Sequence, residues 1–311
     1  MEFGAHLPQM LWETDEPPSL AQLIEYAGLA GEIGLSWLTA NDHIVHRQPW
    51  FDGPTALASV LPFIGGMRVA TSVSLPVVRG PGAFAKTMAA VDRLSDGRLV
   101  IGVGPGSSER DYRAIGIPWE ERWPRFEEAV QALRALLRPD GGPFQGAFYS
   151  TDGMELRPPP LQAGGPPIWI GSWGSDAGLR RVARLADGWI ASGYNATPEA
   201  FGERLARLRE HLRAAGRDDE RFPNAVATLF LHTTDSTSAA DAVLTDVLSP
   251  ALGRPPEELR ERVLVGAPGE CAERLARYAA AGAERVFVWP IGDALRQLER
   301  FHDVVSKIGA G

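Results

Sequence analysis

The sequence predicts a (β/α)8 barrel, and three observations support this prediction. Short apolar runs alternate with longer segments of helical periodicity along the whole 311-residue chain, as in repeated βα units. There are eight such runs, a number that fits a closed barrel better than an open, doubly wound sheet. Hydrophobic residues make up 44% of the chain, enough for a full core. We therefore expect a single domain over residues 1–311, with insertion loops at the carboxyl face.

The predicted strands are short apolar segments bounded by glycine, proline or polar residues. They span residues 3–7, 37–40, 69–75, 99–103, 168–171, 188–192, 226–232 and 286–289. The length beyond a minimal barrel falls in three insertions, at 43–53, 144–167 and 246–268. In barrels of this kind the loops that follow the strands carry the chemistry, so we expect the functional residues in those loops.

The predicted helices combine a start signal with apolar residues at helical spacing. Thr197 and Pro198 form an N-cap followed by a proline in the first turn, and Gly216 ends this helix. Its apolar face consists of Phe201, Leu205, Leu208 and Leu212. The same criteria predict helices from Pro124 to just before Pro139, after Ser175, and over 270–281.

Composition limits the partners that the chain can have. Its 39 acidic and 31 basic residues leave a net charge of -8, which argues against binding to a nucleic-acid backbone. No stretch of 18 apolar residues and no secretory leader is present, so we expect no membrane partner. The single cysteine, Cys271, excludes an internal disulfide and a cysteine metal site. We expect a cytoplasmic protein that binds a small molecule and no metal.

Asp42 and His43 directly follow the second predicted strand, which places them on the rim of the barrel mouth. A histidine beside an acid can move a proton near neutral pH. Alternatively, Asp42 caps a turn and His43 packs under the loop. Trp50, on the same loop, either forms a wall of a substrate pocket or anchors the loop. We expect His46 to be a solvated loop residue.

A glycine-rich turn follows the fourth predicted strand, with glycines at Gly102, Gly104 and Gly106. Glycine has no Cβ, so the backbone there can approach a ligand closely. The Gly-x-Gly-x-Gly spacing, with Pro105 inside it, differs from the dinucleotide-binding pattern. A tight connection without a ligand is the commoner explanation of glycines in such a position.

Two further segments after strands offer groups that could bind a ligand. The hydroxyls of the segment Thr71-Ser72-Val73 can bind the polar edge of a heterocycle, or these residues merely reflect β-propensity. The segment Gly171-Ser172-Trp173-Gly174-Ser175 opens a helix whose free N–H groups can bind an anion. Its last serine is equally a plain N-cap.

These motifs, in this order, resemble those of the bacterial-luciferase-like family of flavin- and deazaflavin-dependent oxidoreductases. The matching stretches are residues 41–43, 70–76, 92–99, 102–106, 167–171 and 186–189. The resemblance covers nearly the whole chain and is firmest over residues 2–189. It implies a (β/α)8 barrel that holds an isoalloxazine, or its 5-deaza analogue, at the carboxyl mouth.

The resemblance also assigns the cofactor contacts. It implies a cis peptide bond between Ser72 and Val73 that faces the middle of the ring. Gly104 and Gly106 then flank the ring or its ribityl chain, and the segment 171–175 holds the phosphate. The segment Gln48-Pro49-Trp50 resembles one in the F420-dependent sugar-phosphate dehydrogenases of this family, in which an acid follows the glycine turn. Here that position is Ser107, and the acids Glu109 and Asp111 could take its place.

The aspartate–histidine pair resembles the branch of the family that uses coenzyme F420, with FMN as the alternative cofactor. We expect hydride transfer to or from a small organic substrate, with His43 near the reacting atoms and Asp42 orienting or tuning it. With FMN the same cavity would favour oxygen insertion, as in a monooxygenase. A non-catalytic flavin-binding protein is a third interpretation. Relatives are commonly homodimers. Five loop tryptophans suggest a flat or apolar substrate, or anchor their loops: Trp12, Trp50, Trp119, Trp123 and Trp173.

Overall fold

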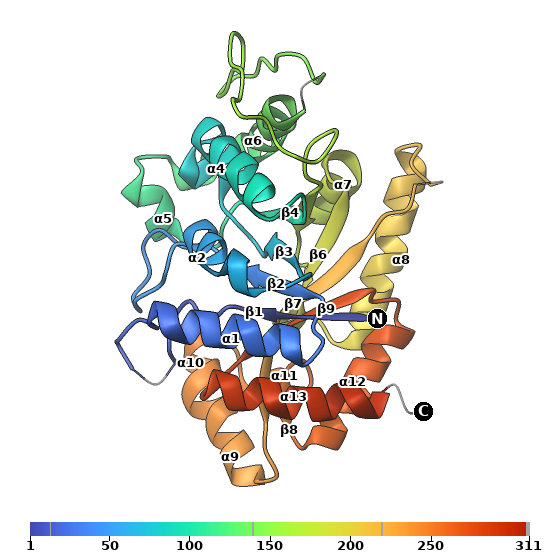
Figure 1. Cartoon of the computed structure of the whole chain (residues 1–311). Coiled ribbons are helices and arrows are strands. Elements are labelled where there is room, and N and C mark those ends of the chain that lie inside the picture. Colours follow the sequence, from blue (N-terminus) through green and yellow to red (C-terminus); the bar gives the residue numbers. More distant parts are fainter. Residues whose placement is uncertain (13, 139, 219, 309–311) are drawn as a thin grey trace.

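The computed structural model describes residues 1–12, 14–138, 140–218 and 220–308, and its strands form one parallel sheet that closes on itself (Figure 1). Eight strands make the barrel, in the order β1-β2-β3-β4-β5-β6-β7-β9, and β9 pairs with β1. They are β1 (Glu2–His6), β2 (Trp37–Ala40), β3 (Arg68–Thr71), β4 (Leu99–Val103), β5 (Ile168–Gly171), β6 (Gly188–Ser192), β7 (Asn224–Thr233) and β9 (Arg285–Pro290). The predicted (β/α)8 barrel is therefore confirmed.

Helices surround the barrel, and α1 packs beside α13 at its outside (Figure 1). The longer helices are α1 (Leu20–Glu32), α2 (Gly53–Val60), α4 (Pro81–Leu94), α6 (Arg122–Leu137), α7 (Asp176–Leu185), α8 (Pro198–Ala214), α12 (Pro268–Ala280) and α13 (Ala294–Ile308). The shorter ones are α3 (Pro76–Arg79), α5 (Glu109–Ala114), α9 (Thr237–Ala242), α10 (Ser249–Leu252), α11 (Pro256–Arg260), η1 (Leu61–Phe63), η2 (Trp119–Glu121), η3 (Gly193–Asn195) and the π-helical η4 (Val243–Leu248).

The predicted start signals act as helix caps. The side chain of Thr197 accepts a hydrogen bond from the N–H of Ala200 at 3.3 Å, and Ser175 caps α7 in the same way. α6 begins two residues before the predicted Pro124 and ends at Leu137. Pro139, expected just beyond that end, lies outside the described residues.

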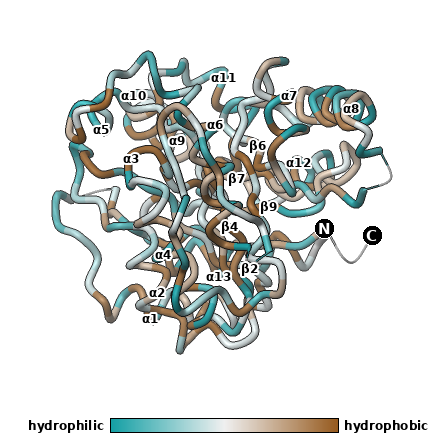
Figure 2. Tube along the Cα trace, turned by 90° about the horizontal axis from the view of Figure 1, so that it is seen from above, coloured by the Kyte–Doolittle hydropathy of each residue, from teal (hydrophilic) through white to brown (hydrophobic). Residues whose placement is uncertain are grey.

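Alternate residues of each strand face the inside of the barrel. Gly4 of β1 is one of them, because a Cβ there would lie 2.5 Å from the Cβ of Trp37 and 2.9 Å from the ring of Phe287. The inner cluster consists of Trp37, Ala70, Val100, Trp169, Ile190, Ala225, Ala227 and Phe287. The opposite strand faces pack against the helices in a larger core, and Figure 2 shows apolar strands at the centre with polar segments at the periphery. By the same alternation His6, two residues after Gly4, faces inward near the carboxyl mouth.

Two details differ from the predicted elements. β3 ends at Thr71 rather than at residue 75, because the chain bulges out of the sheet before Ser74 pairs again with Val103. The predicted insertion 246–268 contains a ninth strand, β8 (Leu264–Gly266), which pairs with the end of β7. Three residues are too few for a period-two hydrophobic signal, so periodicity could not reveal this strand.

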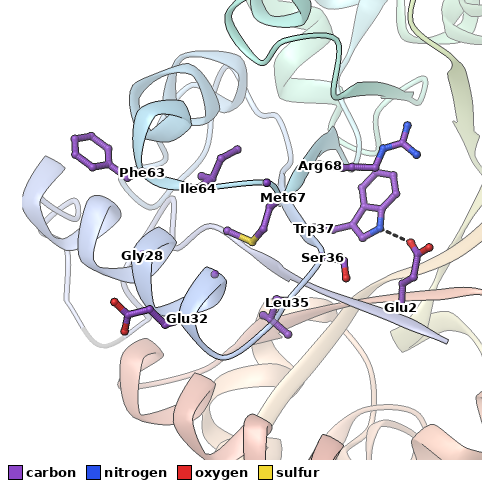
Figure 3. A pocket seen from close by; sticks show the side chains of 13 residues that line it. Glu2, Gly28, Glu32, Leu35, Ser36, Trp37, Phe63, Ile64, Met67 and Arg68 are labelled. Carbon is purple, nitrogen blue, oxygen red and sulfur yellow. Dashed lines mark hydrogen bonds between the residues drawn. The ribbon is translucent and has the colours of Figure 1, made fainter.

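The amino-terminal end of the barrel is closed by polar contacts around Glu2. Its carboxylate accepts hydrogen bonds from the indole of Trp37 at 2.6 Å and from Arg285 at 3.0 Å. A hollow of about 730 Å³ lies beside this cluster, lined by α1, η1 and the side chains of Trp37 and Arg68 (Figure 3). The predicted site residues follow the strands, and none of them lines this hollow.

None of the described helices is both long and apolar enough to cross a membrane. In the same residues, no three side chains of His, Cys, Asp or Glu come together in a way that could hold a metal ion.

Candidate functional site

Three of the predicted segments meet at the side chain of Val73. A Cβ added to Gly104, after β4, would lie 2.8 Å from one methyl group of Val73. A Cβ added to Gly171, at the end of β5, would lie 2.9 Å from the other. The segments after β3, β4 and β5 therefore converge at the carboxyl mouth, and both glycines leave room for Val73.

The peptide bond between Ser72 and Val73 is cis, as the resemblance implies. The hydroxyls of Ser72 and Ser74 are buried and have no hydrogen-bond partner within the described residues. Thr71 differs from the expectation, because its hydroxyl donates to the carbonyl of Gly102 at 2.6 Å and so joins two strands of the barrel wall. The free hydroxyls of this segment are thus those of the two serines.

Contacts within the protein also fix the conformation of the glycine turn. Gly106 has a φ of +87°, a conformation that favours glycine, and a Cβ there would press on Leu75. The hydroxyl of Tyr112 donates to the carbonyl of Pro105 at 2.5 Å and fixes the turn from outside. Ser107 is exposed at the end of the turn.

His43 is held by a carboxylate from another strand–helix connection. Its Nδ1 lies 3.1 Å from Oδ2 of Asp111, at the start of α5. The other oxygen of Asp111 accepts the N–H groups of Ile44 at 2.9 Å and of Val45 at 2.7 Å. With Nδ1–H donating to this carboxylate, Nε2 is the ring atom that can take up or release a proton.

Asp111 is suited to stay ionised in this position. Its side chain is only 1% exposed, and burial by itself would raise its pKa. The hydrogen bonds from His43, Val45 and Ile44 outweigh burial, so the pKa of Asp111 lies below its usual value. A negative charge therefore remains against the imidazole of His43.

Asp42 does not orient His43, contrary to the expectation. Both of its oxygens accept hydrogen bonds from the guanidinium of Arg79, at 2.5 and 2.6 Å, and one also accepts the N–H of Leu75 at 3.3 Å. Arg79 binds Asp52 as well, so it fastens the loop after β2 to α3. Successive side chains of an extended chain point to opposite sides, which separates Asp42 from its sequence neighbour.

An aromatic wall continues from His43 around the mouth. We use this term for six residues: Trp12, Trp50, Trp173, Tyr194, Phe230 and Trp289. The ring of Trp50 lies 5.0 Å from that of His43 and 5.6 Å from that of Trp289, centroid to centroid. Phe230 lies 5.3 Å from Trp289 and 5.9 Å from Tyr194, and further contacts join Trp12 and Trp173.

The other predicted aromatic and histidine positions lie differently. His46 is half-buried rather than fully solvated: its ring packs 4.6 Å from that of Trp50, and burial and the charges of His43 and Arg47 lower its pKa to about 4. Trp119 packs against Tyr112, and Trp123 lies beneath Arg181, so neither belongs to the wall. Trp119 begins η2 and Trp123 lies in the first turn of α6, so both belong to helices rather than to loops.

Sequence reasoning missed His6, whose ring stacks on Trp289 with centroids 3.8 Å apart and planes 9° apart. Burial lowers the pKa of His6 to about 3, and its Nδ1–H donates to the carbonyl of Leu7 at 2.7 Å. His6 is therefore a neutral part of the mouth. The available signal in the sequence was a histidine near the end of the first predicted strand, where side chains can reach the mouth of the barrel.

The segment after β5 combines a capped helix start with an arginine. Ser172 accepts the N–H of Gly174 at 3.2 Å, and Ser175 caps α7. A Cβ on Gly174 would lie 2.2 Å from Cδ of Arg204, so this side chain from α8 passes directly over the segment. Burial and the nearby charge of Arg262 lower the pKa of Arg204. Sequence reasoning missed Arg204, because an arginine on an amphipathic helix has no distinguishing pattern.

The residues present fit a flat heterocycle with an anionic side chain. The buried hydroxyls without a partner in the described part of the chain include those of Thr39, Ser72 and Ser74, and such groups bind the polar edge of a ring. The aromatic wall offers an apolar surface beside them. Arg204, whose Nη1 donates to the carbonyl of Asn195, and the N-terminus of α7 offer N–H groups of the kind that bind anions.

A closed parallel barrel with side chains gathered at its carboxyl mouth is the architecture of (β/α)8-barrel enzymes. A family model described as luciferase-like monooxygenase matches residues 1–252. The chain belongs to this family.

Relatives and solved structures agree with this assignment. The chain is 27% identical to an F420-dependent glucose-6-phosphate dehydrogenase of Microbacterium testaceum, over 90% of each chain. It is 28% identical to an FMNH2-dependent dimethylsulfone monooxygenase of Pseudomonas putida, over 77% of this chain and 64% of that protein. The F420-dependent tetrahydromethanopterin reductase of Methanopyrus kandleri has the same fold, with a TM-score of 0.80 and 18% identity over 98% of each chain. The relatives thus include both F420-dependent dehydrogenases and FMN-dependent monooxygenases.

Proposed function

We propose that this protein is an oxidoreductase that uses coenzyme F420 to transfer a hydride to or from a small organic substrate. The observation that carries the proposal is the pair of His43 and Asp111 at the mouth, 3.1 Å apart. The residue before His43 binds the N–H of Leu75, two residues beyond the Ser72–Val73 bulge, so the pair lies next to the expected ring site. The F420-dependent relative supports this choice of cofactor.

The cofactor would be held by the segments that converge on the mouth. Ser72 and Val73 would face the ring, and Gly104, Gly106 and Ser107 would flank the ring or its side chain. The segment Gly171-Ser172-Trp173-Gly174-Ser175, with Arg204 above it, would hold the phosphate. When bound, a deazaflavin supplies a carbon centre that accepts or donates a hydride and does not readily activate oxygen.

His43 would handle the proton that accompanies the hydride. Asp111 holds Nδ1–H, and this leaves Nε2 to accept the proton of a substrate hydroxyl or to return it to a carbonyl oxygen. Asp42 would help only to hold the loop after β2 in place, because its oxygens accept hydrogen bonds from Arg79. Trp50, edge-on to His43, would bound the substrate pocket.

Titration of the apoprotein with F420 and with FMN, followed by fluorescence, tests the choice of cofactor. We expect tighter binding of F420. Micromolar binding of FMN with none of F420 would favour a monooxygenase. Binding of either cofactor without turnover of any substrate would favour a non-catalytic flavin-binding protein.

The variant Asp111→Asn tests the proton-handling pair separately. Loss of the carboxylate charge should lower kcat by about 10-fold or more, since a positioned base loses its orienting partner. Glu109→Gln, an exposed residue on the same helix, serves as the control. An unchanged kcat for Asp111→Asn would remove Asp111 from the mechanism.

We also propose that residues 1–311 act as one domain and assemble as a homodimer in the cytoplasm. The single, buried Cys271 agrees with a reducing compartment, and the family resemblance supports a dimer. Sedimentation equilibrium tests the assembly, and a monomer at micromolar concentration would contradict it.

A further inference from the structure

The loop between β2 and α2 closes on itself, because its two ends touch. It covers residues 41–52 and carries His43 and Trp50. A Cβ added to Gly53, which follows the loop directly, would lie 2.1 Å from the carbonyl oxygen of Asn41. Loops whose ends meet in this way form compact units and are frequently functional. The contacts that join the two ends therefore also fix where His43 and Trp50 lie.

Gln9, in the segment after β1, bridges the two ends of this loop. Its Nε2 donates to the carbonyl of Asn41 at 3.0 Å and to that of Phe51 at 2.8 Å. Its Oε1 accepts the N–H of Asn41 at 2.8 Å, and its backbone oxygen accepts the N–H of Phe51 at 3.0 Å. Gln9 is fully buried. Its side chain must both donate and accept to make these bonds, which is the property of an amide.

Arg79 makes a second bridge, from α3, between the next residue at each end. Its guanidinium donates to both oxygens of Asp42 and to the carboxylate of Asp52. Asp42 is 3% exposed and also accepts the N–H of Leu75, so this bridge extends to the bulge after β3. A guanidinium carries five donors, enough for two carboxylates at once. The segments after β1 and β3 thus each bind both ends of the loop.

Between its ends the loop is held mainly by hydrogen bonds. Ile44 and Val45 are 44% and 40% exposed, so apolar packing contributes little there. Their N–H groups donate to Asp111, which also binds Nδ1 of His43. Hydrogen bonds are directional, so the place of the imidazole depends on how precisely the loop presents it to this carboxylate.

We propose that Gln9 and Arg79 are positioning residues, which hold His43 and Trp50 at the mouth by joining the two ends of their loop. This inference rests on the proposed role of His43 and names the residues that keep it in place. Both act through the backbone or the carboxylates at the base of the loop. A displacement of about 1 Å can cost a reacting group most of its effect, so the two bridges serve the chemistry as well as the fold.

Two variants of the full chain without cofactor weaken one bridge each. Gln9→Met removes the amide and keeps the length of the side chain. Asp52→Asn removes one carboxylate from Arg79, and its amide oxygen can still cap α2 through the N–H of Thr55. Hydrogen exchange over residues 43–51 should become faster by about 10-fold or more in both variants, because the loop opens locally. Exchange over α6 should stay at its parental rate.

The imidazole of His43 supplies a second readout, which a merely structural role would not change. In the parent its Nδ1–H donates to Asp111, so we expect a proton NMR signal from this group that is absent in His43→Ala. Both variants should broaden or lose this signal while their amide spectra remain those of a folded protein. Glu220→Gln, which removes the exposed partner of Arg217 beyond the end of α8, should change neither readout.

Parental exchange over residues 43–51 together with an unchanged His43 signal in both variants would overturn the inference. Faster exchange over the whole barrel in Asp52→Asn would overturn it too, since the bridges would then serve the fold alone. Asp52→Asn leaves the hydrogen bonds of Gln9 in place, so it decides the question if Gln9→Met does not fold. Absence of F420 binding by the parent would instead contradict the proposed function and leave both bridges standing.

Discussion

At the scale of single residues, the mouth depends on one histidine whose partner comes from far along the chain. His43 and Asp111 are 68 residues apart in sequence and 3.1 Å apart in space. The adjacent Asp42, with its oxygens bound to Arg79, serves the loop instead. The chemistry of the site therefore depends on Asp111, because its carboxylate, and not that of Asp42, contacts the imidazole of His43.

Replacing His43 with alanine should lower turnover by about 10²-fold, the usual contribution of a positioned acid or base. The free energy of unfolding should fall by only about 1 kcal/mol, because Asp111 keeps its two backbone partners. Steady-state rates and thermal melts of His43→Ala measure both effects, with His46→Ala as the control. Equal rates for His43→Ala and the parent would exclude a role for His43 in proton transfer.

The lowered pKa of His46 predicts how the stability of the protein depends on pH. Its pKa in the folded protein is about 4, against 6.5 for an unperturbed histidine. Between these values the unfolded chain binds a proton that the folded chain does not, so stability falls as the pH drops from 6.5 to 4. His46→Gln should therefore lose less thermal stability over that interval than the parent does. Melting curves at several pH values measure this, and the exposed His302→Gln should match the parent.

At the scale of elements, the mouth is shaped by a bulge and by the glycines that receive it. The chain leaves β3 after Thr71, places Val73 between Gly104 and Gly171, and rejoins β4 at Ser74. A third strand that simply continued to residue 75 would not create this arrangement. The segments at the ends of β3, β4 and β5 pack against one another at Val73, so a substitution in one of them affects the other two.

Gly171→Ala should destabilise the protein by about 1–3 kcal/mol, because the new methyl group would lie 2.9 Å from Val73 and overpack the mouth. Gly28→Ala is the matched control. This glycine lies inside α1 with no atom within 4 Å of the added Cβ, so alanine should stabilise the helix by about 0.5–1 kcal/mol. Chemical unfolding of both variants gives the comparison. A neutral Gly171→Ala would show that Val73 moves aside without cost.

At the scale of the whole molecule, the last strand closes the barrel against the first. β9 pairs with β1 from Glu2 to Ala5, and Arg285 of β9 binds Glu2 at 3.0 Å and Glu284 at 2.8 Å. The guanidinium also lies over the rings of Trp37 and Trp169. One arginine, 8% exposed, thus joins strands that are almost the full chain length apart.

We expect Arg285→Met to lower the free energy of unfolding by about 1–3 kcal/mol. Its partners Glu2 and Glu284 are half exposed and can be hydrated, which keeps the loss below that of a fully buried pair. Arg113→Met removes an exposed pair with Glu109 and should change stability by less than about 0.5 kcal/mol. Urea unfolding of both variants tests this, and equal midpoints would mean that β-sheet pairing alone closes the barrel.

Local patterns of the sequence were enough to determine the barrel and most of its elements. The eight predicted strands each overlap a strand of the barrel, and caps such as Thr197 and Ser175 mark helix starts. These features depend on nearest neighbours and on periodicity, both of which a single sequence displays. The resemblance to known motifs, added to these patterns, correctly implied the cis bond before Val73.

The tertiary structure decided which residues meet. Whether Asp42 or Asp111 faces His43 depends on the direction of side chains on two separate loops, and no local pattern encodes that direction. The same holds for Arg204 over Gly174 and for Trp289 against Trp50, where each partner comes from a different βα unit. Contacts between distant segments arise only when the barrel closes, so the sequence determined the scaffold and the fold determined the site.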